Sequence, residues 1–273
     1  MSGWKSTVQR QFNEKAGSYD QYADVQKVMA SRLMRRLDEA VPAPRDILEI
    51  GCGTGACTER VLTRFPQASV SALDIAPGMV EAAKRRLAAS GEQCRWIVAD
   101  VEEWAAAQSA QTCDLIVSNA CFQWLVQPEV TLAHLYRLLR PGGCLLFSTF
   151  GPQTFWELHD SFHEAYARLG RPPARHGLTF RSEAQWKDML LRAGFRDIHT
   201  ESGLKTYVFP SVRQFLHTVK EIGASATQAT GTRGLGQRRL MMEMLQQYET
   251  RHRLRSGIPA TYEIILAVGL RKS

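Results

Sequence analysis

A nine-residue run, ILEIGCGTG at positions 47–55, constrains the fold of this 273-residue chain more than any other segment. An apolar stretch that contains Glu49 leads into three glycines at alternate positions, Gly51, Gly53 and Gly55. Glycine adopts positive φ angles without a steric penalty and lets a ligand approach the backbone closely. A glycine-rich turn between a parallel strand and a helix is where doubly wound α/β proteins bind nucleotide-like ligands. The run therefore predicts an α/β fold with a ligand site at the end of its first strand.

The glycine loop alone is compatible with two classes of ligand. With Ala56 in the last position, it also satisfies the G-x-G-x-x-G/A pattern that places a dinucleotide pyrophosphate at a helix N-terminus. S-adenosylmethionine, by contrast, has no phosphate and carries a cationic sulfonium, so its site should be rich in carboxylates. Three acids, Glu49, Asp74 and Asp100, stand at or near the ends of three predicted strands. These acids favour a methyltransferase and leave a dehydrogenase as the alternative.

Hydrophobic periodicity predicts the order of the secondary-structure elements. Strands are expected at 47–50, 69–74, 95–99, 113–118 and 144–150, with helices at 20–40, 57–65, 77–89 and 130–139. Repeated β–α units of this kind imply a parallel sheet with helices on both faces. Beyond residue 151, helices are expected at 152–169, 182–193, 211–222 and 237–252, a β segment at 195–209 and a last strand at 262–270. Residues 223–236 are rich in Gly, Ala, Ser and Thr, which is typical of a mobile loop.

Positive charge is concentrated in the second half of the chain. Residues 1–150 carry 16 Lys and Arg against 16 Asp and Glu, whereas residues 151–273 carry 18 against 11 and hold the whole net charge of +7. The arginines form two groups in the sequence, Arg233, Arg238 and Arg239, and Arg251, Arg253 and Arg255. One-sided charge of this kind suggests an acidic macromolecular partner, either a nucleic acid or an acidic protein. A solvated helix face without a partner is the simpler alternative.

Other features of the composition exclude several classes of protein. No apolar run approaches the roughly 18 residues of a membrane span, and the N-terminal segment lacks the apolar core of a signal peptide. A cytoplasmic location is therefore expected. The six cysteines form no C-x-x-C pair and have no histidine at metal-ligand spacing, so we expect reduced thiols and no metal site. Cys121 falls near the expected site, but no Cys–His pattern supports a nucleophilic role for it.

Five segments together resemble the class I S-adenosylmethionine-dependent methyltransferases. They are LEIGCGTG at 48–55, LDIAPGMVEAA at 73–83, VADVEEW at 98–104, DLIVSNACFQWL at 114–125 and LLRPGGCLLFSTF at 138–150. The resemblance implies S-adenosyl-L-methionine as cofactor and a Rossmann-like, doubly wound seven-stranded sheet of order 3-2-1-4-5-7-6, mostly parallel with an antiparallel last strand. We expect a single domain over residues 1–273. It would comprise a helical lid at 1–45, a cofactor-binding core at 46–150, a helical insertion at 151–194, and closing strands at 195–273 with substrate helices at 211–252.

A narrower resemblance concerns the substrate. The segments FNEKAGSYDQYADVQ at 12–26, STFGPQTFWEL at 148–158, FRSEAQWKDMLLRAGF at 180–195 and KTYVFPSVRQFLHTVKEIGA at 205–224 are similar to the malonyl-(acyl-carrier protein) O-methyltransferases of biotin synthesis. That family methylates the free carboxylate of a malonyl thioester on acyl carrier protein, an acidic partner that suits the basic second half; malonyl-CoA is an alternative substrate. A methyltransferase for a free di- or tricarboxylic acid such as aconitate would share much of this pattern. A nucleic-acid-binding module is disfavoured, because aromatic and basic residues are not interleaved.

The resemblance also implies contacts to the cofactor. The residues expected to make them are Phe12, Tyr19, Glu49, Gly51, Gly53, Gly55, Asp74, Ile75, Met79, Asp100, Val101, Asn119 and Phe122. Asp74 should hold the ribose hydroxyls, with Met79 packed on the adenine. Asp100 should accept from the adenine amino group beside the Val101 N–H. The three glycines would let the methionine part of the cofactor lie against the backbone. Glu49 would orient the loop or reach the α-amino group through water. Asn119, through its carbonyl, and Phe122 would flank the methyl group.

Methyl transfer to a carboxylate needs no general base. The malonyl carboxylate is already ionised at pH 7, so the enzyme must align oxygen, methyl carbon and sulfur and exclude water. We therefore name no catalytic residue, only candidates for positioning the carboxylate: Tyr19, Gln123, Trp124, Arg181 and Lys220. Close to the methyl group itself, the hydroxyl or indole N–H donors are favoured, because a cation there would lie near the sulfonium.

The N-terminal segment is expected to cover the cofactor. Phe12 and Tyr19 are seven residues apart, which is two helical turns, so both rings can face one cavity. Residues 1–22 are therefore predicted to form a mobile lid that excludes water and supplies a hydroxyl to the substrate carboxylate.

Overall fold

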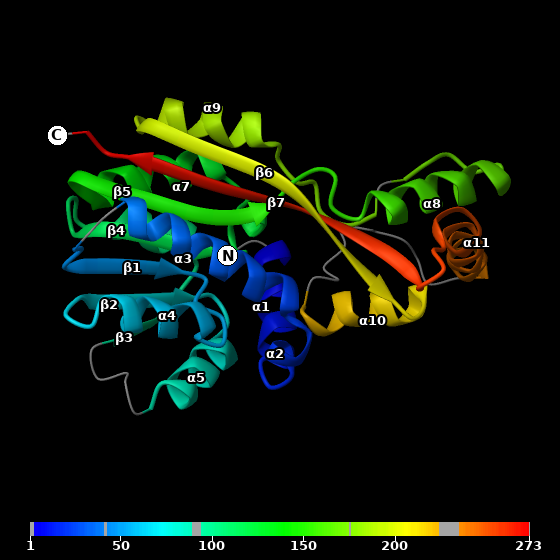
Figure 1. Ribbon diagram of the computed structural model, residues 1–273, viewed down its shortest axis with the longest axis horizontal. Coiled ribbons are helices and arrows are strands. Elements are labelled where there is room, and N and C mark those ends of the chain that lie inside the picture. The colour runs from blue at the N-terminus through cyan, green and yellow to red at the C-terminus, as the bar shows by residue number, and fades with distance from the viewer. Residues whose placement is uncertain (1–2, 41–42, 89–93, 175, 224–234, 273) are drawn as a thin grey trace.

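A seven-stranded sheet of order β3-β2-β1-β4-β5-β7-β6 forms the centre of the protein (Figure 1). The computed structural model describes residues 3–40, 43–88, 94–174, 176–223 and 235–272. The strands are β1 (Asp46–Ile50), β2 (Ser69–Asp74), β3 (Cys94–Val98), β4 (Cys113–Asn119), β5 (Leu139–Phe150), β6 (Arg196–Phe209) and β7 (Ile258–Leu270). Strands β1 to β5 pair in parallel, whereas β7 is antiparallel to both β5 and β6. The predicted fold class and strand order are confirmed.

Helices cover both faces of the sheet. They are α1 (Gly3–Lys15), α2 (Tyr19–Tyr22), α3 (Asp24–Ala40), α4 (Ala56–Arg64), α5 (Pro77–Arg86), α6 (Val101–Ala107), α7 (Pro128–Leu138), α8 (Trp156–Arg168), α9 (Glu183–Ala193), α10 (Val212–Glu221) and α11 (Leu235–His252), with a 3-10 turn, η2, at Phe122–Trp124. One core lies between the sheet and α6, α7 and α9, and a second between the sheet and α3, α4 and α5. This sandwich is what parallel βαβ units produce when their apolar strands are buried on both sides. None of the described helices is long and apolar enough to cross a membrane.

A third core lies beyond the sheet. Strands β6 and β7 continue as a long two-stranded ribbon toward α8, α10 and α11 (Figure 1). Phe162, Phe215, Leu240 and Tyr248 from these helices pack on one another and on Ile258 at the start of β7. The Tyr248 hydroxyl, which is buried, donates to the carbonyl of the residue after Ile258 at 2.7 Å. The helical layer is therefore held firmly at the far end of the ribbon.

The elements differ from the predicted ones in a few places. Helix α6 was not predicted; it has seven residues and begins where the Asp100 side chain accepts from the Glu102 N–H. Strand β5 begins at Leu139, five residues early, because a register shift in its pairing with β4 lets the Pro–Gly–Gly segment remain in the strand. The predicted helix at 152–169 begins only at Trp156, after Phe155 in the left-handed region with φ 60°. Most of the predicted mobile loop, 223–236, lies outside the described residues, as does Arg233.

Candidate active site

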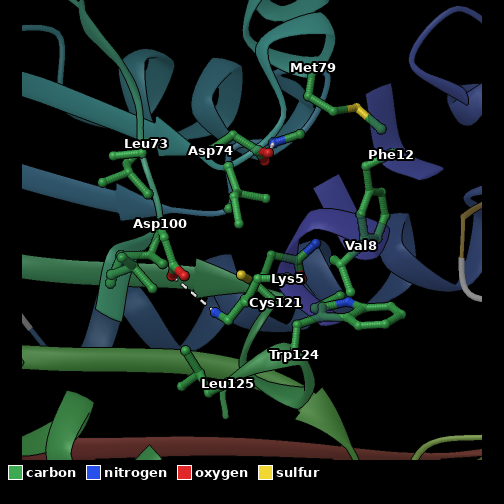
Figure 2. Close-up of a pocket in the computed structure, with 18 of the residues that line it drawn as sticks. Lys5, Val8, Phe12, Leu73, Asp74, Met79, Asp100, Cys121, Trp124 and Leu125 are labelled. Carbon is green, nitrogen blue, oxygen red and sulfur yellow. Dashed lines mark hydrogen bonds and ion pairs between the residues drawn. The ribbon is translucent and has the colours of Figure 1, made fainter. Parts of the chain in front are cut away.

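A cavity lies at the carboxyl ends of β1, β2 and β4 and beside the segment that follows β3 (Figure 2). The carboxyl edge of a doubly wound sheet is the usual ligand site of such folds. Ten of the thirteen residues predicted to contact a cofactor line this cavity: Phe12, Tyr19, Gly51, Gly53, Asp74, Ile75, Met79, Asp100, Val101 and Asn119. Helix α1 crosses it from the other side. The structure therefore brings the predicted residues together from five separate segments of the chain.

The glycine loop has two different structural roles. Gly51 has φ 72°, and a Cβ placed on it would lie 2.6 Å from the Cβ and Sγ atoms of Cys121, so no larger residue fits there. Gly55 has φ 85° and is the N-cap of α4, where an added Cβ would come within 3.0 Å of the Cβ of Ala83 in α5. Gly55 does not line the cavity. It serves helix packing, and the prediction that it contacts the cofactor is not supported by its position.

Asp74 ties together the two loops that border the cavity. Its Oδ2 accepts from the Gly53 N–H at 2.9 Å and its Oδ1 accepts from the Ala76 N–H at 2.8 Å. The residue is 9% exposed, and burial raises the pKa of its carboxyl, opposed by these backbone donors. Each oxygen of a carboxylate can accept more than one hydrogen bond, so Asp74 retains acceptor capacity toward the cavity.

Two predicted cofactor residues lie away from the cavity. Glu49 is fully buried next to Thr58 and Cys57 of α4, neither of which reaches hydrogen-bond geometry with it, and burial raises the pKa of the Glu49 carboxyl to about 7. Phe122 is also fully buried and stacks on Phe147 with ring centroids 4.4 Å apart. Both residues lie in the core beneath the site, because a strand residue and a residue of a 3-10 turn can face either way. Sequence spacing does not determine in which direction such a side chain faces.

Lys5 is a cavity residue that the sequence analysis missed. Its Nζ lies 3.0 Å from Asp100 Oδ1 (Figure 2). The same Nζ lies 2.7 Å from Glu102 Oε2, and the residue is 6% exposed. Val8 and Phe12 stand three and seven residues further on and line the same cavity. The i, i+3, i+7 spacing places all three on one helix face. That spacing was the available signal, and it was obscured because a lysine is normally expected on the solvated face.

The N-terminal helices close over the cavity with aromatic contacts. The centroid of the Phe12 ring lies 5.4 Å from that of Trp124, in an edge-on arrangement, and 6.3 Å from that of Tyr19. The ring centroids of Trp4 and Trp124 are 6.2 Å apart. The expectation that two helical turns align Phe12 with Tyr19 is wrong in detail, because α1 ends at Lys15 and α2 begins at Tyr19. Both rings nevertheless line the same cavity.

A second cavity of about 460 Å³ adjoins the first. The two cavities share Phe12, Tyr19, Ala120 and Trp124. Its other walls come mainly from apolar and aromatic residues of α8, α10, α11 and the segments beside them: Phe150, Phe155, Leu158, Phe162, Leu178, Phe180, Leu216, Val219, Ile222, Leu240, Met241 and Tyr262. A ligand in this cavity would meet a ligand in the first one at the shared wall.

Four of the five candidates for positioning a carboxylate border this second cavity. Tyr19, Gln123, Trp124 and Lys220 line it. Arg181 does not line either cavity; its guanidinium carbon lies 5.8 Å from the centroid of the Trp186 ring. Arg181 is therefore no longer a candidate for positioning the carboxylate, because it stacks on Trp186, a contact that the sequence did not indicate.

Tyr19 at the shared wall and Cys121 in the first cavity are both neutral. Burial, with the nearby carboxylates of Asp74 and Asp20, raises the pKa of Tyr19, so its hydroxyl stays protonated and can donate. Burial also raises the pKa of the Cys121 thiol to about 12, which excludes the thiolate that a nucleophile requires. Within the described ranges, no group of three His, Cys, Asp or Glu side chains is placed to hold a metal ion.

Comparisons with known proteins agree with this geometry. Residues 47–143 match the family model described as "Methyltransferase domain". The malonyl-(acyl-carrier protein) O-methyltransferase of Brevibacillus brevis is 48% identical, over 96% of this chain and 94% of its own length. The same enzyme from a Paenibacillus species is 45% identical, over 97% of this chain and 99% of its own length. Among solved structures, the fold is similar to a Haemonchus contortus phosphoethanolamine N-methyltransferase in complex with S-adenosyl-L-methionine, with TM-score 0.61, 15% identity, and coverage of 100% of this chain and 61% of that one.

The fold and the site define a class I S-adenosylmethionine-dependent methyltransferase. Within that class, the chain belongs to the malonyl-(acyl-carrier protein) O-methyltransferase family. The residues present fit the cofactor that this family implies. Asp74 and Asp100 line the cavity as acceptors, and Lys5, the one basic side chain among the described lining residues, is already paired with acids. A cationic sulfonium suits such a cavity better than a pyrophosphate, which sets aside the dinucleotide alternative.

Proposed function

We propose that this protein methylates the free carboxylate of a malonyl group carried on acyl carrier protein, for the synthesis of the pimelate part of biotin. The observation that carries the proposal is the apolar cavity of about 460 Å³ that meets the cofactor cavity at Tyr19 and Trp124. The substrate named for the relatives, malonyl-(acyl-carrier protein), supports the same assignment. When bound, S-adenosyl-L-methionine supplies an electrophilic methyl group.

The residues of the chain act by positioning and by excluding water. The malonyl carboxylate is ionised at neutral pH, so no side chain has to remove a proton. The protonated Tyr19 hydroxyl can donate to one carboxylate oxygen at the shared wall, leaving the other oxygen free to attack. Phe12 and Trp124 form the apolar part of that wall and exclude water from it. Alignment in a dry cavity supplies the rate enhancement that an acid–base pair supplies elsewhere.

The charge of the second cavity argues against a free tricarboxylate such as aconitate. Lys220, which is exposed, is the one Lys or Arg among the described residues that line this cavity. A free di- or tricarboxylic acid would keep one or two further carboxylates inside the cavity, and buried charges require partners. A malonyl thioester has a single carboxylate and presents its neutral arm to the apolar walls. The cavity therefore favours a thioester.

The basic surface beside the cavity suits an acidic carrier. Helix α11 lines the cavity with Gln237, Leu240 and Met241. The adjacent Arg238 and Arg239 are exposed, and neither makes an ion pair with any described residue. The second arginine group is different, because Arg251 pairs with Asp160 and Arg253 with Glu249, so much of its charge is balanced locally. We infer that an acidic carrier docks against α11 at the cavity mouth.

The substrate assignment is tested by a methyl-transfer assay. Malonyl-acyl carrier protein, malonyl-CoA, malonate and aconitate are compared at equal concentration with S-adenosyl-L-methionine in excess. We expect the highest kcat/KM with the carrier-bound substrate, lower values with malonyl-CoA, and negligible turnover of the free acids. Efficient turnover of aconitate together with none of malonyl-acyl carrier protein would contradict the proposal.

Reversing the charge of Arg238 and Arg239 together should weaken carrier docking. We expect the double variant Arg238→Glu/Arg239→Glu to raise KM for malonyl-acyl carrier protein by about tenfold and to flatten its salt dependence, because rim charges act mainly on encounter. Turnover of malonyl-CoA at saturation should change little. Arg35→Glu/Arg95→Glu, at two exposed positions that line neither cavity, is the matched control for net charge. Equal losses on both substrates would show that the two α11 arginines support the fold or the site rather than docking.

A further inference from the structure

We propose that Lys5 is a latch: its ammonium group locks α1 across the Asp100 end of the cofactor cavity, and release of this latch sets the rates at which cofactor enters and product leaves. The inference rests on the cofactor site and is independent of the identity of the acyl substrate. It assigns to one side chain the control of the lid that the N-terminal segment was predicted to form.

The latch is a buried ion pair between segments 95 residues apart in the sequence. The Lys5 Nζ donates to Asp100 Oδ1 at 3.0 Å (Figure 2) and also lies 2.7 Å from Glu102 Oε2. Burial lowers the pKa of Lys5, but the two carboxylates outweigh it and the net pKa is raised, so the ammonium stays charged. Removing one partner of such a pair leaves an uncompensated buried charge.

The acids that receive Lys5 belong to a rigid part of the core. The Glu102 carboxylate also accepts from the N–H groups of Val126 and Gln127 and from the Thr131 hydroxyl, so it anchors the start of α7. Asp100 in turn caps α6. The latch therefore joins a helix that lies over the cavity to two acids that other elements of the core hold in place.

The other polar attachments of α1 are weaker than the Lys5 pair. Gln9 donates to the Ile75 carbonyl at 2.7 Å, and Asn13 accepts from the Gly78 N–H at 2.6 Å; both are single neutral hydrogen bonds. Lys15 makes a part-buried pair with Glu221 at 2.8 Å and has 25% of its side chain exposed, against 7% for Lys5, so solvent screens this pair more than the Lys5 pair. Among the polar attachments of α1, Lys5 is thus the one whose loss should change lid opening most.

The composition of the latch predicts a distinctive kinetic signature. Both partners are protein groups, so the pair can form with or without a ligand in the cavity and stabilises the closed lid in both cases. Loss of the latch should accelerate lid opening in the free protein and in the cofactor complex alike. Cofactor association and dissociation should therefore both become faster, while the dissociation constant changes little. A residue that only contacts the cofactor would instead change the dissociation constant, mainly through the dissociation rate.

Stopped-flow tryptophan fluorescence of the full chain with S-adenosyl-L-methionine measures these rates directly. Trp4 of α1 lies 6.2 Å from Trp124, so movement of the lid should change the emission. For Lys5→Met we expect both rate constants to rise by about tenfold or more and the dissociation constant to stay within about threefold. Lys5→Arg should restore slow exchange at least in part, and Lys15→Met, at the more exposed ion pair of the same helix, should change both rates much less than Lys5→Met does.

A second variant separates the latch from a purely structural role. Glu102→Gln in the Lys5→Met background removes one of the two carboxylate charges that Lys5 no longer balances, so it should recover part of the lost thermal stability while cofactor exchange stays fast. The proposal is overturned if Lys5→Met leaves both rates at the wild-type values, if only the dissociation constant changes, or if Glu102→Gln restores slow exchange together with stability.

Discussion

Replacing Asp74 by alanine should weaken binding of S-adenosyl-L-methionine by about 2–3 kcal/mol, or roughly 30- to 150-fold. The carboxylate lines the cofactor cavity and accepts from the Gly53 and Ala76 N–H groups at 2.9 and 2.8 Å. Its loss would remove the acceptor expected for the ribose hydroxyls and would also release the two loops that shape the site. Isothermal titration calorimetry of the variant and the wild type provides the comparison.

A matched control distinguishes the loss of a ligand contact from general destabilisation. Asp114 also sits on a strand of the sheet and accepts from the Arg45 and Asp46 N–H groups, but it pairs with Arg140 and does not line the cavity. Asp114→Ala should lower the melting temperature and leave cofactor affinity unchanged. If Asp74→Ala binds the cofactor normally, or if tight NAD binding replaces it, the assignment of this cavity is wrong.

The sheet could be predicted because its information is local. Each β–α unit has an apolar strand, a turn and an amphipathic helix, and the right-handed crossover rule leaves few ways to assemble such units. The start of β7 was missed by four residues, since Ile258 begins pairing with β6 before the alternating pattern becomes visible. Helix α6 was missed because a seven-residue helix has too few turns to establish a period.

The cofactor site was predictable where a motif specifies the backbone. Gly51, Asp74 and Asp100 belong to strand ends, and the parallel sheet brings all such ends to one edge. Glu49 and Phe122 were misplaced because their direction depends on packing against α4 and α9, which no local pattern encodes. Sequence spacing identified the segment correctly in both cases, but not which way the side chain faces.

The substrate cavity could not be predicted in this way. Its walls come from α8, α10, α11 and the segments around Phe150 and Phe180, which are far apart in the sequence. Arg181 was a reasonable candidate for a carboxylate from its chemistry, yet it stacks on Trp186. Lys220 was equally reasonable and does line the cavity. Only the tertiary arrangement separates the two.

Deleting residues 1–22 should reduce methyl transfer to less than about 1% of the wild-type rate, because loss of a closed, water-excluding site removes the alignment on which this reaction depends. The deletion removes Phe12 and Tyr19 from the wall shared by the two cavities, and with them the hydroxyl expected to hold the substrate carboxylate. It also removes Lys5 and leaves Asp100 and Glu102 facing water rather than buried and unpaired. Initial rates with malonyl-acyl carrier protein measure the effect.

The sheet should survive this deletion. The two cores that flank the sheet are built from α3 to α7, α9 and the strands, with no residue from α1 or α2. The truncated protein should therefore keep a cooperative thermal transition, while its affinity for the cofactor falls and bound cofactor exchanges rapidly with free cofactor. The single variant Tyr19→Phe divides the loss further, since it removes the hydroxyl but keeps the ring and the closed lid. A truncated protein that still methylates its substrate at the wild-type rate would show that the N-terminal helices take no part in the site. That result would contradict the roles assigned to Phe12, Tyr19 and Lys5.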